Sequence, residues 1–194
     1  MNVRRHMQPS AVTVAPDDPI SRARDLMQEH GFGLLLVVSA EGELAGFVTR
    51  AGLKEIADWD APVERHSHPA RFAVTPEDTL EKAALILLSN RLVLLPVVED
   101  GVLVGVITQG ELLKGLTRGL GIGLKATRLT VNVRNESEDL YEVLALLRSH
   151  GARILSLVQG ETRNGTCDIV LRIQGVEQKD KLRDELEAAL KSRR

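Results

Sequence analysis

The chain repeats itself after about sixty residues, and this duplication constrains its fold more than any other feature of the sequence. Residues 3–9, VRRHMQP, align with residues 63–69, VERHSHP. The octapeptide GFVTRAGL at 46–53 returns as GVITQGEL at 105–112. A repeat of this length is a supersecondary unit that buries its apolar face only by packing on a neighbouring copy. We therefore expect two similar units packed face to face.

Each repeat has the same predicted order of elements, β-α-β-β-α. Asp18 and Asp78 precede apolar residues at helical spacing, a position where their side chains would cap a helix. Short apolar runs ended by polar turns predict a hairpin in each repeat. A second helix is expected after each hairpin, at 50–57 and at 109–116.

The duplication, the element order and the two octapeptides together resemble tandem CBS domains, the pair known as a Bateman module. The resemblance covers residues 1 to about 118 and implies one CBS domain at 1–60 and a second at 61–118. Members of this family typically bind adenine nucleotides or related adenosyl compounds in the cleft between the two copies. The resemblance therefore implies AMP, ADP or ATP as a regulatory ligand. In the family, the octapeptide Thr approaches phosphate, and the acid three residues later accepts hydrogen bonds from the ribose hydroxyls.

The second repeat carries every part of this pattern. Thr108 matches the phosphate position and Glu111 matches the ribose position. A carboxylate of this kind can accept hydrogen bonds from two hydroxyls. The resemblance also implies a base-binding strand at Leu92, Val93, Leu94 and Pro96. Arg91 is expected near the phosphate region, where it would supply charge-assisted hydrogen bonds.

The first repeat departs from the pattern. Thr49 matches the phosphate position, but Gly52 stands where the acid is expected and offers no acceptor. Leu36 stands where the family often has Pro. The other residues implied at this site are Phe32, Gly33, Leu34 and, near the phosphate, Arg50. We therefore expect the second site to be the stronger of the two.

Thr108 and Glu111 also fit a structural role. A Thr followed three residues later by Glu forms a capping box, in which the two side chains satisfy free backbone N–H groups at a helix start. The two interpretations are compatible, because a helix N-terminus also attracts phosphate. Both remain open from the sequence.

The composition changes beyond residue 118. Residues 119–125 are rich in glycine and predict a hinge. Residues 126–194 predict the order β-α-β-β-α, which is ferredoxin-like with its last strand missing or supplied otherwise. This segment resembles an ACT domain, a small regulatory module that often senses amino acids. The ACT ligand loop usually has Gly just before its first helix, where this chain has Glu138, so we expect an interaction and dimerisation module, with an amino-acid sensor as the alternative.

The sequence shows no catalytic or metal-binding set of residues. His66 and His68 form a His-x-His pair, but Cys167 is the single cysteine and lies far along the chain, so no four metal ligands stand together. A net charge of −2 gives no general attraction to nucleic acid or to anionic lipid. The apolar runs are too short to span a membrane, and the start lacks the apolar segment of a secretory signal. We expect a cytoplasmic protein that is not an enzyme and has no resident cofactor.

Two CBS domains followed by an ACT domain resemble the arrangement of the acetoin-utilization regulatory proteins. The expected protein is a non-enzymatic regulator that binds an adenine nucleotide in the CBS pair and relays the binding to the C-terminal domain. The alternatives are an amino-acid-responsive regulator whose CBS pair is a dimer scaffold, and an interaction module without a ligand. We also expect a homodimer, and a regulated protein partner that the sequence does not identify. By resemblance, the CBS contact would use helical faces carrying Leu26, Met27, Leu87 and Leu88.

Overall fold

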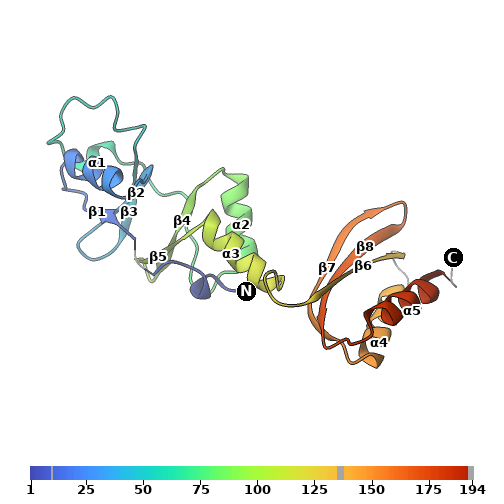
Figure 1. The fold of residues 1–194 in the computed structure, drawn as a ribbon. Helices are drawn as coiled ribbons and strands as arrows, with labels where there is room; N and C mark the ends of the chain where they lie inside the picture. The colour runs from blue at the N-terminus through green and yellow to red at the C-terminus, as the bar shows by residue number, and fades with distance from the viewer. Residues whose placement is uncertain (10, 135–137, 192–194) are drawn as a thin grey trace. The chain divides into compact units, whose positions relative to one another are not determined.

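The computed structural model describes residues 1–9, 11–134 and 138–191 and confirms the expected mixed α and β fold (Figure 1). The chain divides into two compact units, Met1–Gly115 and Leu116–Arg194. Among the described residues, no helix is long and apolar enough to cross a membrane.

The first unit contains both repeats, and each repeat contributes a small sheet and a helix. Strands β1, β2 and β3 form one sheet in that order, with β1 parallel to β2 and β2 antiparallel to β3. Strands β4 and β5 form an antiparallel pair, and Val74 makes a single parallel bridge to Val97 where the first repeat has β1. The elements are β1 (Thr13–Val14), α1 (Ile20–Glu29), β2 (Leu34–Val38), β3 (Leu44–Thr49), α2 (Leu80–Ser89), β4 (Leu94–Glu99), β5 (Val102–Thr108) and α3 (Gln109–Gly119).

Both hairpins form where glycine permits the turn. In the second repeat, Glu99 pairs with Val102, which leaves Asp100 and Gly101 as a two-residue loop. Both loop residues have positive φ, 51° and 86°, as a type I′ turn requires. The apolar strands that flank the turn therefore fold back on each other in one register.

Helices α1 and α2 begin differently from the expectation. Asp18 and Asp78 do not cap them: each carboxylate instead accepts a hydrogen bond of 2.8 Å from the backbone N–H three residues before it. Helix α2 is capped by Thr79, whose Oγ1 accepts from the N–H of Lys82 at 3.1 Å. The aspartates therefore stabilise the turn that leads into each helix.

Each repeat completes the hydrophobic core of the other. Val3, in a short 3-10 turn at Val3–Arg5, is fully buried in the core of the second repeat. Val63, in the equivalent turn at Val63–His66, is fully buried in the core of the first repeat. The N-terminal segments of the two repeats are thus exchanged, which the sequence alignment did not predict.

The exchanged segments continue along the edge of the opposite hairpin. Gln8 forms two backbone hydrogen bonds with Val106 of β5, of 2.8 and 3.0 Å. His68 forms the equivalent pair with Phe47 of β3, of 2.8 and 2.9 Å. The approach is so close that a Cβ atom on Gly105 would lie 2.3 Å from the carbonyl oxygen of Gln8. Each octapeptide therefore begins with glycine because the crossing segment leaves no room for a side chain there.

The second helix expected in the first repeat does not form. Residues 50–57 make turns, although α3 forms at the equivalent place in the second repeat. The N–H of Gly52 does reach Oγ1 of Thr49 at 3.1 Å, so a first turn begins. It does not continue as a helix, and glycine, which stands here in place of an acid, is a poor helix former. The chain instead turns back to α1, where Trp59 accepts a hydrogen bond from the N–H of Ser21.

The second unit has the expected order β-α-β-β-α. Its sheet has the strand order β6-β8-β7, and both helices lie on one face of it (Figure 1). Leu147 and Leu182, one from each helix, are buried in the same core as Leu171 of the central strand. The turn at Asn164 and Gly165 has positive φ at both residues, as Asn-Gly hairpins do. The elements are β6 (Thr127–Arg134), α4 (Asp139–Ser149), β7 (Arg153–Arg163), β8 (Thr166–Gln174) and α5 (Lys179–Lys191).

The segment expected to be a hinge is bonded to this second sheet. Oγ of Ser156 donates a hydrogen bond of 2.8 Å to the carbonyl of Leu120. Nε2 of Gln174 donates one of 2.6 Å to the carbonyl of Lys125. Residues 120–125 therefore pack as part of the C-terminal unit, in keeping with the division of the chain after Gly115.

Candidate functional site

Two cavities lie between the repeats, and the sixty-residue shift relates their linings. The larger one, which we call the Thr108 cavity, has a volume of about 480 Å³. The smaller one, which we call the His68 cavity, has about 360 Å³. Residues of the Thr108 cavity include Gln8, Phe32, Gly33, Leu34, Val93 and Thr108. Residues of the His68 cavity include Phe47, His68, Arg71, Leu92, Leu94 and Pro96.

The cavities combine the predicted residues in a crossed way. Phe32 and Gly33, which the resemblance implies for the first site, line the cavity that holds Thr108. Leu92 and Pro96, implied for the second site, line the His68 cavity instead. Val93 does face Thr108, and both Leu34 and Leu94 line both cavities. Each cavity is therefore built from both repeats.

Glu111 is held at the start of α3 by three side chains. Its Oε2 accepts a hydrogen bond from the hydroxyl of Thr108. Its Oε1 accepts a hydrogen bond of 2.9 Å from Nε2 of Gln8 and lies 3.5 Å from Nζ of Lys114. The residue is only 8% exposed and does not itself line the Thr108 cavity. Its carboxylate is thus a buried acceptor directly behind Thr108.

This environment keeps Glu111 ionised. Burial raises the pKa of its carboxyl, but the hydrogen bonds from Thr108 and Gln8 lower it by more, so the pKa lies below its ordinary value. The N–H of Glu111 is 3.5 Å from Oγ1 of Thr108, at the limit of a helix-capping contact. Only part of the expected capping box is present, because the glutamate side chain bonds the threonine hydroxyl.

The equivalent place in the first repeat has no acid. Oγ1 of Thr49 accepts the N–H of Gly52, and neither residue lines the His68 cavity. The ring of His68 lies against that of Phe47, with centroids 5.6 Å apart. The cation in this lining is Arg71, which the sequence analysis did not select. The His68 cavity is therefore mainly apolar, with one cation at its edge.

The two arginines expected near phosphate lie outside both cavities. Arg50 donates from Nη2 to the carbonyls of Met27 and Phe32, at 2.8 and 2.6 Å, and so caps the end of α1. Arg91 occupies the turn after α2 with a positive φ of 54°, where the first repeat has Gly31. Neither arginine lines the Thr108 or the His68 cavity.

Sequence reasoning missed Gln8 and His68 as site residues. Both were visible in the alignment of residues 3–9 with 63–69, where they occupy equivalent positions. Nothing in that alignment shows that each segment crosses to the opposite hairpin. The signal that could have pointed to them is the glycine at the start of each octapeptide, because a glycine within a strand often marks a place where another backbone comes close.

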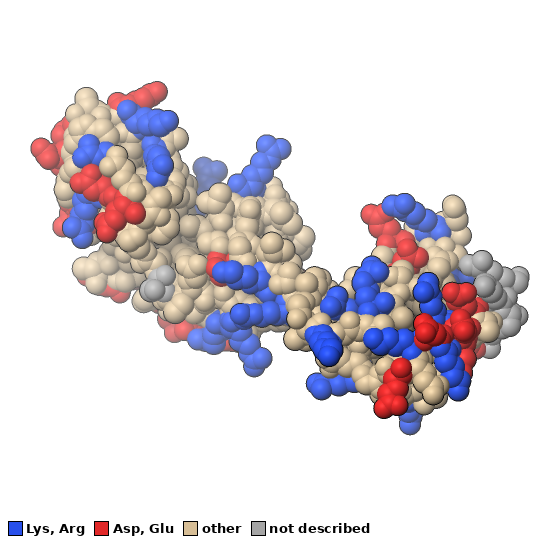
Figure 2. All heavy atoms as spheres, viewed as in Figure 1, with Lys and Arg blue, Asp and Glu red and all other residues tan. Residues whose placement is uncertain are grey.

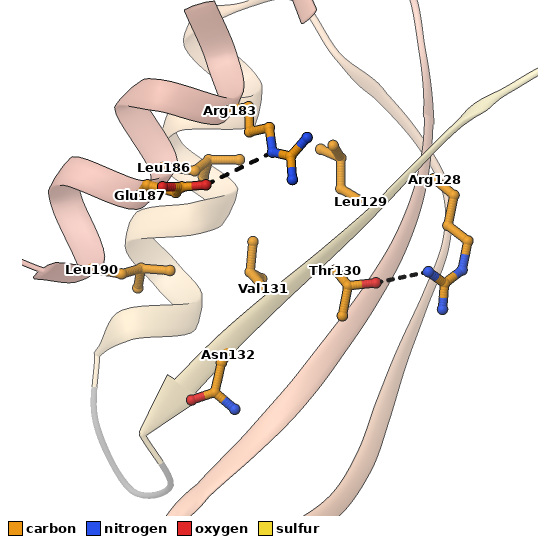
Figure 3. Close-up of a pocket in the computed structure, with 9 residues that line it drawn as sticks. All are labelled: Arg128, Leu129, Thr130, Val131, Asn132, Arg183, Leu186, Glu187 and Leu190. Atoms are coloured by element: carbon orange, nitrogen blue, oxygen red, sulfur yellow. Dashed lines mark hydrogen bonds and ion pairs between the residues drawn. The ribbon is translucent and has the colours of Figure 1, made fainter. Parts of the chain in front are cut away.

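In the second unit, a cavity of about 450 Å³ lies between β6 and α5 (Figure 3). Leu186 and Leu190 of α5 point towards β6, and Arg183 forms an ion pair of 3.7 Å with Glu187 at its rim. Glu138, expected to crowd an amino-acid site, is exposed at the start of α4.

The charged groups of the described chain do not suggest a metal site. No group of three or more His, Cys, Asp or Glu residues that could hold a metal ion occurs among the described residues. On the face shown in Figure 2, Lys and Arg side chains lie close to Asp and Glu side chains on both units.

Comparison with known proteins identifies the first unit. The family model described as "CBS domain" matches residues 3–57 and 67–118, which is more than half of the chain. The chain is 34% identical over 105 residues to inosine-5'-monophosphate dehydrogenase of Methanocaldococcus jannaschii. That match covers 53% of this chain but only 21% of the dehydrogenase, so the chain spans about a fifth of the length of this curated relative.

Three solved structures have similar folds. The structure of CBSX2 in complex with AMP has a TM-score of 0.55 at 26% identity, covering 60% of this chain and 96% of that one. A CBS domain pair/ACT domain protein from Thermotoga maritima has a TM-score of 0.57 at 25% identity, covering 62% and 99%. A putative acetoin utilization protein from Vibrio cholerae has a TM-score of 0.57 at 23% identity, covering 63% and 94%.

Proposed function

The chain belongs to the CBS domain family, and we propose that it is a non-enzymatic regulatory protein that binds an adenine nucleotide in the Thr108 cavity. The observation that carries this proposal is the position of a threonine hydroxyl and a buried carboxylate beside an apolar cavity of about 480 Å³. AMP, ADP and ATP are the ligands proposed.

The lining of the cavity divides into a part suited to a base and a part suited to a sugar phosphate. Phe32, Leu34 and Val93 offer apolar surface for an aromatic ring. Thr108 stands directly before α3, whose first N–H groups and dipole favour a phosphate. Glu111 has acceptor capacity for ribose hydroxyls, since an ionised carboxylate has about four lone-pair sites.

The comparisons support a nucleotide as the ligand class. CBSX2, whose structure was solved in complex with AMP, resembles this chain in fold and at 26% identity over 60% of the chain. The match to inosine-5'-monophosphate dehydrogenase covers about a fifth of that enzyme, so it supports no catalytic role for this chain. The proposed role is therefore regulation through ligand binding.

The His68 cavity is the weaker candidate for the same ligand. Gly52 leaves it without a ribose acceptor, although Arg71 at its edge has the charge to attract a phosphate. We expect occupancy there only at higher nucleotide concentration than in the Thr108 cavity.

The C-terminal unit is proposed as an ACT-like interaction and dimerisation module that receives the signal. Its edge strand β7 exposes Ile154 and Leu157, which suit strand pairing with a second copy. The CBS contact expected from the sequence needs correction, because Met27 and Leu87 are buried in their own cores. The exposed apolar side chains of α2 are Leu85 and Leu88, and these replace them in the proposed homodimer.

Titration calorimetry of the full chain with AMP, ADP, ATP and GMP tests the proposed function. We expect saturable binding of at least one adenine nucleotide, lost in Thr108→Val and retained in the matched variant Thr49→Val. Free amino acids belong in the same panel. Binding of an amino acid without any adenine nucleotide would replace the proposal with the amino-acid-responsive alternative.

A further inference from the structure

Gln8 lies where its side chain reaches both the Thr108 cavity and Glu111. It lines the cavity, and its Nε2 donates a hydrogen bond of 2.9 Å to Oε1 of Glu111. We call this hydrogen bond the Gln8 latch. The donor and acceptor are 103 positions apart in sequence. The latch therefore exists only because the N-terminal segment crosses to the second repeat.

The backbone of Gln8 is held by several contacts, whereas its side chain is held by the single hydrogen bond to Glu111 among the hydrogen bonds described. Two backbone hydrogen bonds hold residue 8 on Val106, and Val3 anchors the same segment in the core. Arg4 adds ion pairs to Glu77 and Glu99, at 2.8 and 2.6 Å. Gln8 itself is exposed to solvent, so its amide can leave Glu111 without unfolding the segment.

The latch uses acceptor capacity that a ribose would need. Thr108 donates to Oε2 of Glu111 and the Gln8 amide donates to Oε1, so both carboxylate oxygens already accept a hydrogen bond. The Gln8 amide and Nζ of Lys114 both lie on the Oε1 side of the carboxylate. Each carboxylate oxygen can accept two hydrogen bonds, but Glu111 is only 8% exposed, so a ribose hydroxyl that approaches Oε1 competes with the Gln8 amide for the little access that remains.

We propose that Gln8 competes with the ribose of the nucleotide for Glu111 and so sets the affinity and the ribose preference of the Thr108 cavity. This inference rests on the proposed function. It assigns the N-terminal segment a role in ligand control in addition to its role in the core. Binding then exchanges the latch for a ribose contact, and the Gln8 side chain is released to solvent.

The first repeat supplies the internal control. His68 stands at the position equivalent to Gln8 and makes the same two backbone hydrogen bonds, to Phe47. The acid is missing there, since Gly52 replaces it, and the His68 ring lies on Phe47 instead. Loss of the His68 side chain should therefore affect packing without changing access to a carboxylate.

The test compares Gln8→Ala and His68→Ala in the full chain. AMP and its 2′,3′-dideoxy analogue are titrated by calorimetry, and ligand-free melting temperatures are measured. Gln8→Ala should bind AMP about tenfold more tightly, the scale of one hydrogen bond to a charged group. Its ligand-free melting temperature should fall, because the latch is lost. The dideoxy analogue, which has no hydroxyl for Glu111, should gain little. His68→Ala should leave the affinity of the tighter site, the Thr108 cavity, unchanged, whatever its effect on weaker binding in the His68 cavity.

Each other outcome has a distinct meaning. The proposed competition is wrong if Gln8→Ala binds AMP no more tightly than the native protein. It is also wrong if the dideoxy analogue gains as much affinity as AMP. In both cases the proposed function stands. If AMP binds only to Gln8→Ala, the latch is supported as a block to the site. If no adenine nucleotide binds to any of the three proteins, the proposed function fails and the latch fails with it.

Discussion

A Cβ atom on Gly105 would lie 2.3 Å from the carbonyl oxygen of Gln8, a distance that no packed structure tolerates. The neighbour is backbone, so a side-chain rotation cannot relieve the overlap. We predict that Gly105→Ala lowers the free energy of unfolding by more than about 2 kcal/mol, as strain at a fixed backbone contact does. Urea denaturation measures the change. Gly33→Ala is the control, because a Cβ there meets nothing within 4 Å, and a loss as large in that variant would contradict the argument.

Arg91 and Gly31 occupy equivalent turns after α2 and α1, with φ of 54° and 70°. The left-handed conformation costs a residue with a side chain about 1 kcal/mol or more. We predict that Gly31→Ala destabilises the protein by about 1 kcal/mol, whereas Arg91→Gly leaves stability equal or slightly higher. Thermal and urea unfolding of both variants would show the difference. A marked loss of stability in Arg91→Gly would mean that the arginine side chain makes a contact that outweighs the backbone cost.

Glu111 should make stability depend on pH in the acid range. Its pKa in the folded protein lies below the ordinary value of 4.5. A carboxyl with a lowered pKa stabilises the fold above its unfolded pKa, and this contribution is lost as the pH falls through the folded pKa. The difference in unfolding free energy between the native protein and Glu111→Gln should therefore be constant above about pH 5.5 and shrink below 4.5. Urea unfolding at a series of pH values tests this, and a difference that stays constant down to acid unfolding would refute it.

The two octapeptides should contribute unequally to nucleotide binding. Glu111→Ala removes the proposed ribose acceptor and should weaken AMP binding by about 1.5–3 kcal/mol, the range for hydrogen bonds to a charged group. Thr49→Ala should weaken it less, because its repeat has Gly52 in place of the acid. Calorimetry measures the AMP affinity of both variants. Equal losses of affinity would show that the difference between Glu111 and Gly52 has no role in binding.

Leu88 should contribute to a homodimer. It is 70% exposed on α2, and Leu85 beside it is 66% exposed, so the helix presents apolar surface to solvent. The equivalent of Leu88 in the first repeat is the polar Gln28. We predict that Leu88→Lys weakens self-association while Gln28→Lys does not. Light scattering at micromolar concentration measures both, and a native chain that is monomeric there would remove the basis of the prediction.

The sequence predicted the elements well and their partners poorly. The hairpins, α3 and the β-α-β-β-α order of the second unit follow local patterns of apolar residues and turns, and the structure confirms them. The crossing of residues 1–8 and 61–68 depends on backbone pairing between distant segments, which leaves no periodic signal. The crossing is reflected in the sequence at Gly46 and Gly105, where the crossing backbone leaves no room for a side chain.

The same limit explains why the two cavities group the predicted site residues differently from the sequence. Phe32 and Leu92 align perfectly between the repeats, yet each lines the cavity assigned to the other. Alignment shows which residues are equivalent and not which ones meet across an interface. The family resemblance implies a dimer contact at Met27 and Leu87, but a resemblance does not show what covers an apolar helix face. In this fold their own sheets cover both.

The exchange of N-terminal segments means that one repeat of this design cannot be complete by itself. A chain with a single repeat would lack the valine that fills its core and the strand that crosses its hairpin. Two such chains would supply these parts to each other, so the duplicated protein is a covalently linked form of a segment-swapped pair. The link keeps the two halves at high effective concentration. It also lets the two repeats differ in sequence, as they do at the equivalent positions Glu111 and Gly52.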